Sequence, residues 1–178
     1  MPHRYPQEVS LRDGRRALLR PFAPGDVPAL WDFFQRLPAR TRRLAWDRID
    51  DRAVVESWGR NVDYGAVLPL VAVDGGRIVA DATLHRRQGG PLRLVGRIKW
   101  LIDPEWRGVG LSTIILTHFI SIARENGLRH LSTLLVADVE AAAVRILTDL
   151  GFRCTVLPGY GADPDGGAHD MAFMILAL

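Results

Sequence analysis

The chain has 178 residues, of which 48% are hydrophobic and 24% charged, and this mixture excludes a disordered or fibrous protein. A chain of this length buries enough surface to form a single domain over residues 1–178. The net charge of +3 is small, so the overall charge balance does not demand nucleic acid as a partner.

The number of cysteines and the length of apolar runs indicate whether the protein binds metal through cysteine and where in the cell it is located. Cys154 is the only cysteine, which excludes an intramolecular disulfide and a cysteine-based metal site, and we expect no metal. Its apolar surroundings predict a packed, inert thiol. The N-terminus lacks the apolar segment of a signal peptide, and no run of about 18 apolar residues indicates a membrane span. We therefore expect a cytoplasmic protein without a membrane partner.

Arginine supplies nearly all of the positive charge, because Lys99 is the only lysine among 23 basic residues. A guanidinium stays protonated and binds phosphate or carboxylate through paired hydrogen bonds, so anionic ligands suit this chain. The arginines do not form a basic run of the kind that binds nucleic acid. We therefore expect no nucleic-acid partner.

The first third of the chain predicts a hairpin followed by two helices. Asp13-Gly14 favours a tight turn with positive φ between two short apolar stretches. The predicted elements are strands at 9–12 and 17–20, a helix capped by Asp26 and ended by Pro38, and a second helix after Asp51.

In the rest of the chain, the spacing of apolar residues alternates between that typical of strands and that typical of helices. The predicted elements are strands at 67–73, 78–84 and 92–102, a helix from Pro104 to Gly127, a strand at 131–136, a helix at 140–150, and strands at 153–157 and 171–176. Residues 159–169 are rich in glycine and aspartate and predict a loop. The order β-β-α-α-β-β-β-α-β-α-β-β predicts an α/β (α+β) fold with one mixed sheet flanked by helices.

The segment from Leu101 to Ser112 predicts a strand, a short loop and the start of a helix. The first turn of a helix has N–H groups without intrahelical partners and a partial positive charge, and glycine lets a phosphate approach the backbone. Arg107 would add a positively charged hydrogen-bond donor. The segment lacks the Gly-Lys-Ser/Thr of a P-loop and the Gly-x-Gly-x-x-Gly of a dinucleotide fold. It therefore predicts an anion site of another kind.

This segment resembles motif A of the GNAT superfamily of acyl-CoA N-acyltransferases, whose signature is Arg/Gln-x-x-Gly-x-Gly/Ala. Arg107, Gly110 and Ser112 occupy the three signature positions. Leu150-Gly151-Phe152 is similar to the end of the family's second motif. The opening residues 11–26 also resemble bacterial protein-lysine acetyltransferase domains of this superfamily. The resemblance covers most of the chain and implies a mostly antiparallel sheet and a bacterial transferase.

By this resemblance, acetyl-CoA or another acyl-CoA is the co-substrate. The backbone of Leu101 and Ile102 would pair with the pantetheine amides, and a backbone N–H of this strand would polarise the acyl carbonyl. A primary amine, of a small molecule or a protein lysine, would attack directly after losing a proton. The residues expected to hold the pyrophosphate are Arg107, Gly108, Val109, Gly110, Leu111 and Ser112.

The sequence departs from the family pattern at three positions. Ser112 replaces the usual Gly or Ala, Glu140 replaces an Asn that contacts the cofactor, and Leu147 replaces the tyrosine that protonates the thiolate. The candidates for a general base are Asp81, His85, Glu105 and Glu140. His85 has the best intrinsic pKa for proton transfer, and we predict His85 and Glu140 as catalytic residues.

Two alternatives to an enzyme remain, and the departures from the family pattern support the first of them. The chain could be a non-catalytic GNAT-fold module that binds acyl-CoA or a partner protein, and nucleic-acid binding by the arginines is the weakest alternative. Residues of the 159–169 stretch and Asp170 could line the pocket of a cationic amine. The paired C-terminal strands are compatible with a homodimer.

Overall fold

The computed structural model describes residues 4–60 and 62–178, and these form two compact units. The first unit holds the chain up to Leu84 together with Lys99–Ile114. The second holds His85–Ile98 and Ile115–Leu178. Each unit has its own internal packing, and a single domain over 1–178 stays a prediction.

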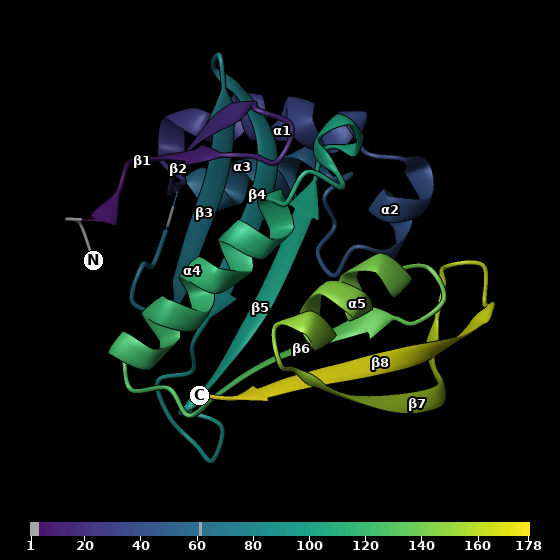
Figure 1. Ribbon diagram of the computed structural model, residues 1–178. Helices are drawn as coiled ribbons and strands as arrows, with labels where there is room; N and C mark the ends of the chain where they lie inside the picture. Colours follow the sequence, from purple (N-terminus) through teal and green to yellow (C-terminus); the bar gives the residue numbers. More distant parts are fainter. Residues whose placement is uncertain (1–3, 61) are drawn as a thin grey trace. The chain divides into compact units, whose positions relative to one another are not determined.

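Eight strands among the described residues form a sheet in the order β1-β2-β3-β4-β5-β6-β8-β7 (Figure 1). The β5–β6 pair is parallel, whereas β1–β2, β2–β3, β6–β8 and β7–β8 are antiparallel, so the predicted mixed, mostly antiparallel sheet is confirmed. The strands are β1 (Gln7–Ser10), β2 (Arg16–Pro21), β3 (Val67–Asp74), β4 (Arg77–His85), β5 (Val95–Ile102), β6 (His130–Val136), β7 (Arg153–Ala162) and β8 (Ala168–Ala177).

Among the residues that the structure describes, there is one α-helix more than the sequence predicts. Single 3-10 turns at Pro24–Asp26 and Pro104–Trp106 follow β2 and β5. The unexpected helix α2 has no buried residue and no apolar stripe, so its sequence carries no helical period. The helices are α1 (Val27–Arg36), α2 (Ala39–Leu44), α3 (Arg52–Arg60), α4 (Leu111–Glu125) and α5 (Ala141–Asp149).

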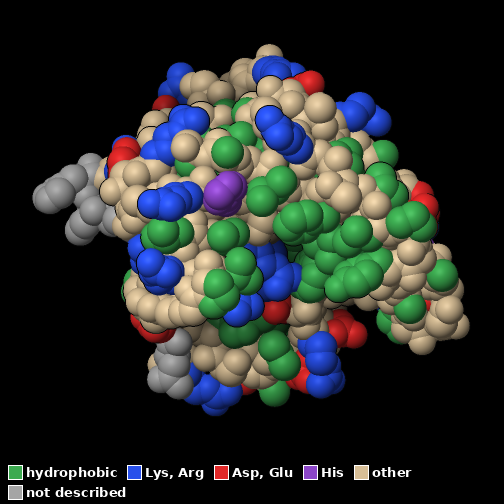
Figure 2. All heavy atoms as spheres, turned by 90° about the horizontal axis from the view of Figure 1, so that it is seen from below, with side chains coloured by type: hydrophobic (Ala, Val, Ile, Leu, Met, Phe, Trp, Pro, Cys, Tyr) green, Lys and Arg blue, Asp and Glu red, His purple; other side chains and the backbone are tan. Residues whose placement is uncertain are grey.

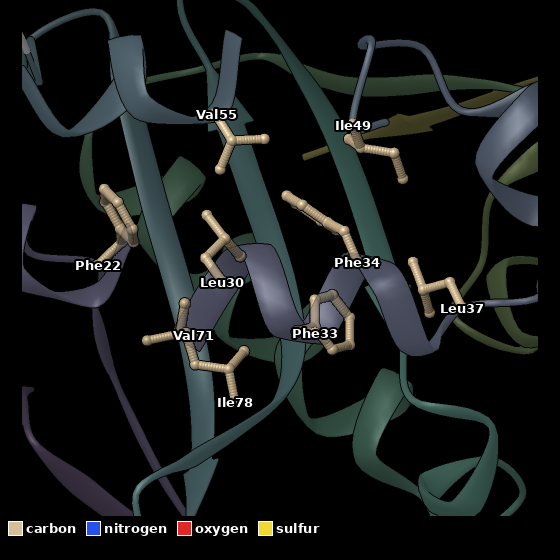
Figure 3. Close-up of a cluster of buried hydrophobic side chains, with 9 residues drawn as sticks. All are labelled: Phe22, Leu30, Phe33, Phe34, Leu37, Ile49, Val55, Val71 and Ile78. Atoms are coloured by element: carbon tan, nitrogen blue, oxygen red, sulfur yellow. The ribbon is translucent and has the colours of Figure 1, made fainter. Parts of the chain in front are cut away.

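The core of the first unit forms where α1 and α3 pack on the sheet (Figure 3). The spacing of apolar residues in α1 points Leu30, Phe33 and Phe34 toward the same side, and each is at most 2% exposed. The ring of Trp58 from α3 meets Phe34 edge to face, with 6.0 Å between ring centroids. The predicted apolar stripe of the first helix is thereby confirmed.

Asp26 is the N-cap residue of α1, as predicted, but its side chain makes no capping hydrogen bond to that helix. Both of its carboxylate oxygens bind Arg20, at 2.6 and 2.7 Å, and one of them accepts the Ala23 N–H at 2.8 Å. The hydrogen bond from Arg20 lowers the pKa of Asp26 against the opposing effect of burial. The carboxylate therefore closes the 3-10 turn at Pro24–Asp26, which directly precedes α1.

In the second unit, α5 contacts the strands β6, β8 and β7, which are neighbours in the sheet. The β6–β8 register runs without interruption from His130↔Ala177 to Val136↔Met171. Leu147 of α5 is fully buried, and Gly151, with φ of 91°, ends that helix as predicted.

The predicted loop at residues 159–169 is wrong at both ends and correct only at residues 163–167. β7 continues to Ala162, and β8 begins at Ala168, with Gly161 opposite His169. A bulge between Leu157 and Gly161 absorbs the glycines, so residues that favour turns lie inside a strand. Cys154, expected to be packed, is exposed because it lies on β7, the edge strand of the sheet.

Candidate functional site

The turn between β5 and α4 has the geometry of an anion site. Gly108 and Gly110 adopt φ of 75° and 94°, a region that L side chains rarely adopt. The Ile114 N–H donates to the Gly110 carbonyl at 3.1 Å and closes the first turn of α4. The N–H groups that precede Ile114 in this turn have no carbonyl earlier in the helix to bind. Residues 107–112, which we call the 107–112 turn, therefore combine two glycines of positive φ with the open first turn of a helix.

The 107–112 turn is open to ligands. Arg107 and Gly108 are exposed, and Val109, Gly110 and Ser112 are partly exposed. Leu111 is the exception, because its side chain is buried in the core. The six residues predicted to hold a pyrophosphate are consecutive in the sequence, and five of them have accessible surface.

The β1–β2 connection supports this turn from a distant part of the sequence. The Arg12 N–H donates to the Val109 carbonyl at 3.1 Å. A Cβ placed on Gly110 would lie 3.4 Å from Nε of Arg12, so the Arg12 side chain passes over that glycine. Arg15 donates to the Glu105 carbonyl at 3.0 Å and places its guanidinium 4.3 Å from the Trp106 ring centroid. Local sequence patterns did not identify these arginines.

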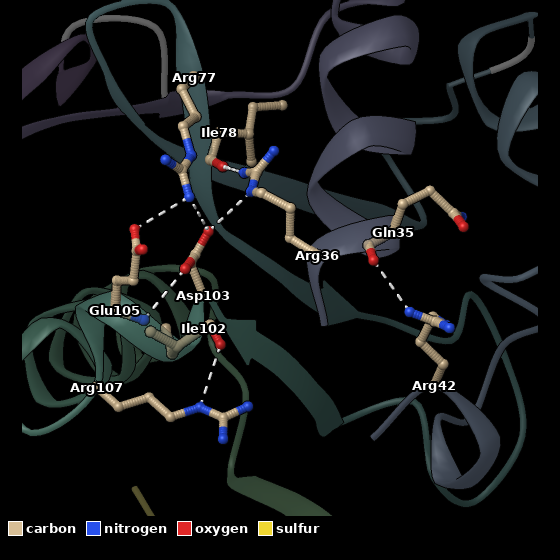
Figure 4. A network of polar contacts seen from close by, with 9 residues as sticks. All are labelled: Gln35, Arg36, Arg42, Arg77, Ile78, Ile102, Asp103, Glu105 and Arg107. Atoms are coloured by element: carbon tan, nitrogen blue, oxygen red, sulfur yellow. Dashed lines mark hydrogen bonds and ion pairs between the residues drawn. The ribbon is translucent and has the colours of Figure 1, made fainter. Parts of the chain in front are cut away.

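Asp103 anchors the other side of the turn (Figure 4). Its side chain is 2% exposed and accepts hydrogen bonds of 3.0 Å from Arg36 and from Arg77. Its second oxygen accepts the Glu105 N–H at 3.1 Å. Burial would raise the pKa of Asp103, but these hydrogen bonds lower it below the usual value. Glu105, one of the four base candidates, forms an ion pair with Arg77 at 3.2 Å.

Arg107 folds back on the strand that precedes it. Its Nε donates to the Ile102 carbonyl at 3.3 Å, which leaves the two terminal nitrogens of its exposed guanidinium for a ligand (Figure 4). This bond links the end of β5 to the turn.

The end of β5 lies beyond its parallel pairing with β6. That pairing covers only Val95↔His130, Gly96↔Leu131 and Arg97↔Ser132. The peptide groups of Leu101 and Ile102, which the resemblance assigns to pantetheine, follow after the ladder has ended. Ile102 is 7% exposed, and Leu101 packs against the core of the first unit.

An acidic pair with one lysine forms a second polar cluster in the first unit. Lys99 of β5 donates to Asp47 Oδ2 at 2.5 Å. The charges of both Lys99 and Asp47 act on Asp81 of β4, which is half-buried. Burial raises the pKa of Asp81 to about 7, Lys99 lowers it, and Asp47 raises it.

The two predicted catalytic residues belong to the second unit. His85 is the last residue of β4 and is half-buried. Glu140 precedes α5, and its Oε2 accepts the Val136 N–H at 2.6 Å. Burial raises the pKa of Glu140, whereas that hydrogen bond lowers it. Glu140 therefore has a structural contact at the end of β6, and its catalytic role stays a prediction.

The residues expected to line an acceptor pocket fold the tip of the β7–β8 hairpin. Asp163 Oδ1 accepts the N–H groups of Asp165 and Gly167, at 2.8 and 3.2 Å. His169 lies 3.6 Å from carboxylate oxygens of both Asp163 and Asp138. Tyr160 is 70% exposed.

No group of His, Cys, Asp or Glu in residues 4–60 and 62–178 could hold a metal ion. No helix in the described part of the chain is long and apolar enough to cross a membrane. On the face drawn in Figure 2, Lys and Arg side chains are interspersed among other types, and no continuous basic surface covers its described residues.

The chain is similar to proteins of one family. The sequence profile of the acetyltransferase (GNAT) family matches residues 31–152. An acetyltransferase of Pseudomonas aeruginosa is 28% identical over 172 residues, covering 88% of this chain and 82% of that protein. The GNAT domain of PAT from S. lividans superposes with a TM-score of 0.80 at 20% identity and covers 100% of this chain and 99% of that one. The structure of yncA from Salmonella typhimurium, which contains its cofactor acetyl-CoA, has a TM-score of 0.76 at 21% identity and covers 91% of this chain and 94% of that one.

Proposed function

The chain belongs to the acetyltransferase (GNAT) family, and on this premise we propose that it transfers an acetyl or other acyl group from acyl-CoA to a primary amine. The observation that carries the proposal is the 107–112 turn, where two glycines with positive φ lead into the open first turn of α4. An acyl-CoA carries a pyrophosphate, and such a turn binds phosphate through backbone N–H groups.

The proposed cofactor contacts begin at the pyrophosphate and continue along β5. Backbone N–H groups of the turn, with the terminal nitrogens of Arg107, bind the pyrophosphate. The peptide groups of Leu101 and Ile102 pair with the pantetheine arm, because the parallel ladder has ended before them. A backbone N–H in this stretch polarises the acyl carbonyl and stabilises the oxyanion that forms on attack.

The acceptor in this proposal is a primary amine that attacks the thioester directly. An alkylamine with a pKa near ~10.4 is almost wholly protonated at pH 7, so a base must remove a proton before attack. The candidates for this base are Asp81, Glu105, His85 and Glu140, and the sequence predicts the last two. The acceptor is a small molecule or a protein lysine, the latter in keeping with the resemblance of residues 11–26 to lysine acetyltransferases. A cytoplasmic location and a homodimer also stay proposals.

Calorimetry with coenzyme A and acetyl-CoA tests the binding step. We expect saturable binding by the native chain, and Gly110→Glu should abolish it by placing a carboxylate where phosphate binds. Gly90→Glu is the matched control, since Gly90 also has a positive φ, of 78°, and open space surrounds it in a surface bend outside the site. Unchanged affinity in a folded Gly110→Glu variant would show that the turn is not the site.

Turnover separates the enzyme from the alternative of a non-catalytic module that binds acyl-CoA or a partner protein. The replacement of the usual tyrosine by Leu147 favours that alternative. Acetyl-CoA is incubated with spermidine, an Nα-acetylated lysine amide or poly-lysine, while free thiol is measured. Thiol release above the rate without protein supports the transferase, and binding without release supports the module.

A further inference from the structure

Asp81 is a carboxylate that the fold desolvates without supplying a hydrogen-bond donor. Within residues 4–60 and 62–178, no hydrogen bond reaches its oxygens and no cation lies within ion-pair distance. Asp103 shows the contrast, because it is more buried but accepts three hydrogen bonds. Ionising a desolvated carboxylate that accepts no hydrogen bond costs free energy. The surroundings of Asp81 therefore favour its protonated form.

Lys99 does not neutralise Asp81, because its ammonium is bonded to Asp47. When Asp81 is ionised, the two carboxylates and one ammonium leave a net charge of −1. This charge attracts a cationic amine and repels an anionic acceptor. After Asp81 takes up a proton, the cluster is neutral and no longer holds the cation.

Asp81 also lies close to the proposed acyl end of the site. The Asp103 N–H donates to the Val79 carbonyl at 2.9 Å, so β4 adjoins the end of β5. Asp81 follows Val79 by two positions, and Lys99 precedes Leu101 by two positions along β5. The cluster therefore lies beside the peptide groups proposed to bind pantetheine.

From this arrangement we infer that Asp81 is the general base of the transfer and binds the ammonium of a cationic primary amine. The inference rests on the proposed acyl-CoA function. Asp81 accepts one proton from the ammonium, and the neutral nitrogen then forms a bond to the acyl carbon. The carbon–sulfur bond breaks, coenzyme A leaves as the thiolate and takes up a proton, and the amide nitrogen loses its remaining extra proton to solvent.

The acid–base behaviour of Asp81 agrees with this role. Burial raises its pKa to about 7, so near neutral pH the carboxyl group both takes up and releases a proton readily. The groups that face it are Lys99, which lowers the pKa, and Asp47, which raises it. If Asp81 is the base, these opposite effects must also shift the pH dependence of turnover, which a purely structural aspartate would not do.

The first measurement compares Asp81→Asn with native protein, using acetyl-CoA and the most active of spermidine, an Nα-acetylated lysine amide and poly-lysine. We expect kcat to fall about 100-fold or more, as for loss of a general base. The calorimetric affinity for acetyl-CoA should not change. Asp74→Asn is the matched control, because Asp74 is an exposed aspartate at the end of β3 outside the cluster, and it should keep native activity.

The second measurement is the pH dependence of kcat/KM. The native profile should rise through about pH 7 as Asp81 ionises. Lys99→Met removes a positive charge and should move this rise to higher pH, whereas Asp47→Asn removes a negative charge and should move it to lower pH. Carbon-13 NMR of the Asp81 carboxyl group in protein without substrate should show the same two shifts.

The outcomes separate this inference from the function on which it rests. Failure of the native chain to bind acetyl-CoA would remove the acyl-CoA function itself. Binding and turnover that persist unchanged in Asp81→Asn would overturn the role of Asp81 alone. Binding without turnover toward all three amines would overturn the transferase function, and the role of Asp81 with it. An Asp81 pKa near the ordinary value of an aspartate would overturn the role of Asp81 alone.

Discussion

Arg36 of α1 and Asp103 at the end of β5 form an ion pair across 67 residues of sequence, with 3.0 Å between Nε and Oδ2. The same guanidinium donates to the Ile78 carbonyl at 2.6 Å. A single arginine therefore joins the first helix, the start of β4 and the segment that leads into the 107–112 turn. The position of this turn depends on contacts that no local motif contains.

Replacing Asp103 by Asn should destabilise the protein by about 3 kcal/mol at pH 7, since breaking a buried pair leaves a charge without its partner. The free energy of unfolding in urea measures this cost. Glu105→Gln is the control, because its ion pair with Arg77 is exposed and should contribute less than about 1 kcal/mol. Equal losses in the two variants would contradict a special role for Asp103.

The cost of Asp103→Asn should depend on pH. Because the folded-state pKa of Asp103 is lowered, the carboxylate stabilises the fold fully above its unfolded pKa of about 3.9. This contribution is lost as the pH falls toward the folded value. The difference in unfolding free energy between native and variant protein should therefore shrink below about pH 4. A difference that stays constant from pH 7 to strongly acidic pH would contradict the assignment.

Asp81→Asn should have the opposite effect on stability. The folded pKa of Asp81 is about 7, so its protonated form stabilises the fold at low pH, and that contribution is lost as the pH rises through 7. We expect the variant to gain on the order of 4 kcal/mol relative to native protein between pH 4 and pH 8. Thermal unfolding at both pH values measures the gain. The same substitution should then stabilise the protein while it removes activity.

Gly59→Ala should destabilise the packing of α3 on α1. A Cβ at Gly59 would fall inside van der Waals contact with Cγ2 of Val27. Overpacking of this kind costs about 1–3 kcal/mol, which exceeds the gain of up to about 1 kcal/mol from better helix propensity. Gly25→Ala, where the added Cβ meets no atom within 4 Å, serves as the control in urea unfolding. A more stable Gly59→Ala variant would show that Val27 moves aside at no cost.

Arg12→Ala should weaken coenzyme A binding about 3- to 10-fold, equivalent to loss of roughly 1 kcal/mol from one exposed charge contact. The Arg12 side chain passes over Gly110, and no carboxylate among the described residues pairs with it. Calorimetry at low and high salt should show the loss mainly at low salt. Arg16→Ala is the control, because Arg16 pairs with Glu8 on β1. Equal effects of the two substitutions would indicate a general charge effect.

The sequence by itself determined the features that rest on neighbouring residues. The apolar stripe through Leu30 and Phe34, the glycines of the 107–112 turn and the strand that leads into it were all predicted correctly. Periodicity and turn chemistry act over a few residues, so they can be read without knowledge of the rest of the fold.

Only the tertiary structure decided which charged groups are buried and which partners they meet. Asp81 and Asp103 are both aspartates near apolar residues, yet one has no hydrogen-bond donor and the other has three. Likewise, the glycines near Gly161 predicted a loop, but pairing with His169 kept them in a strand. The pKa of a carboxyl group depends on desolvation and on charges within a few ångströms, and here those charges come from residues far apart in the chain.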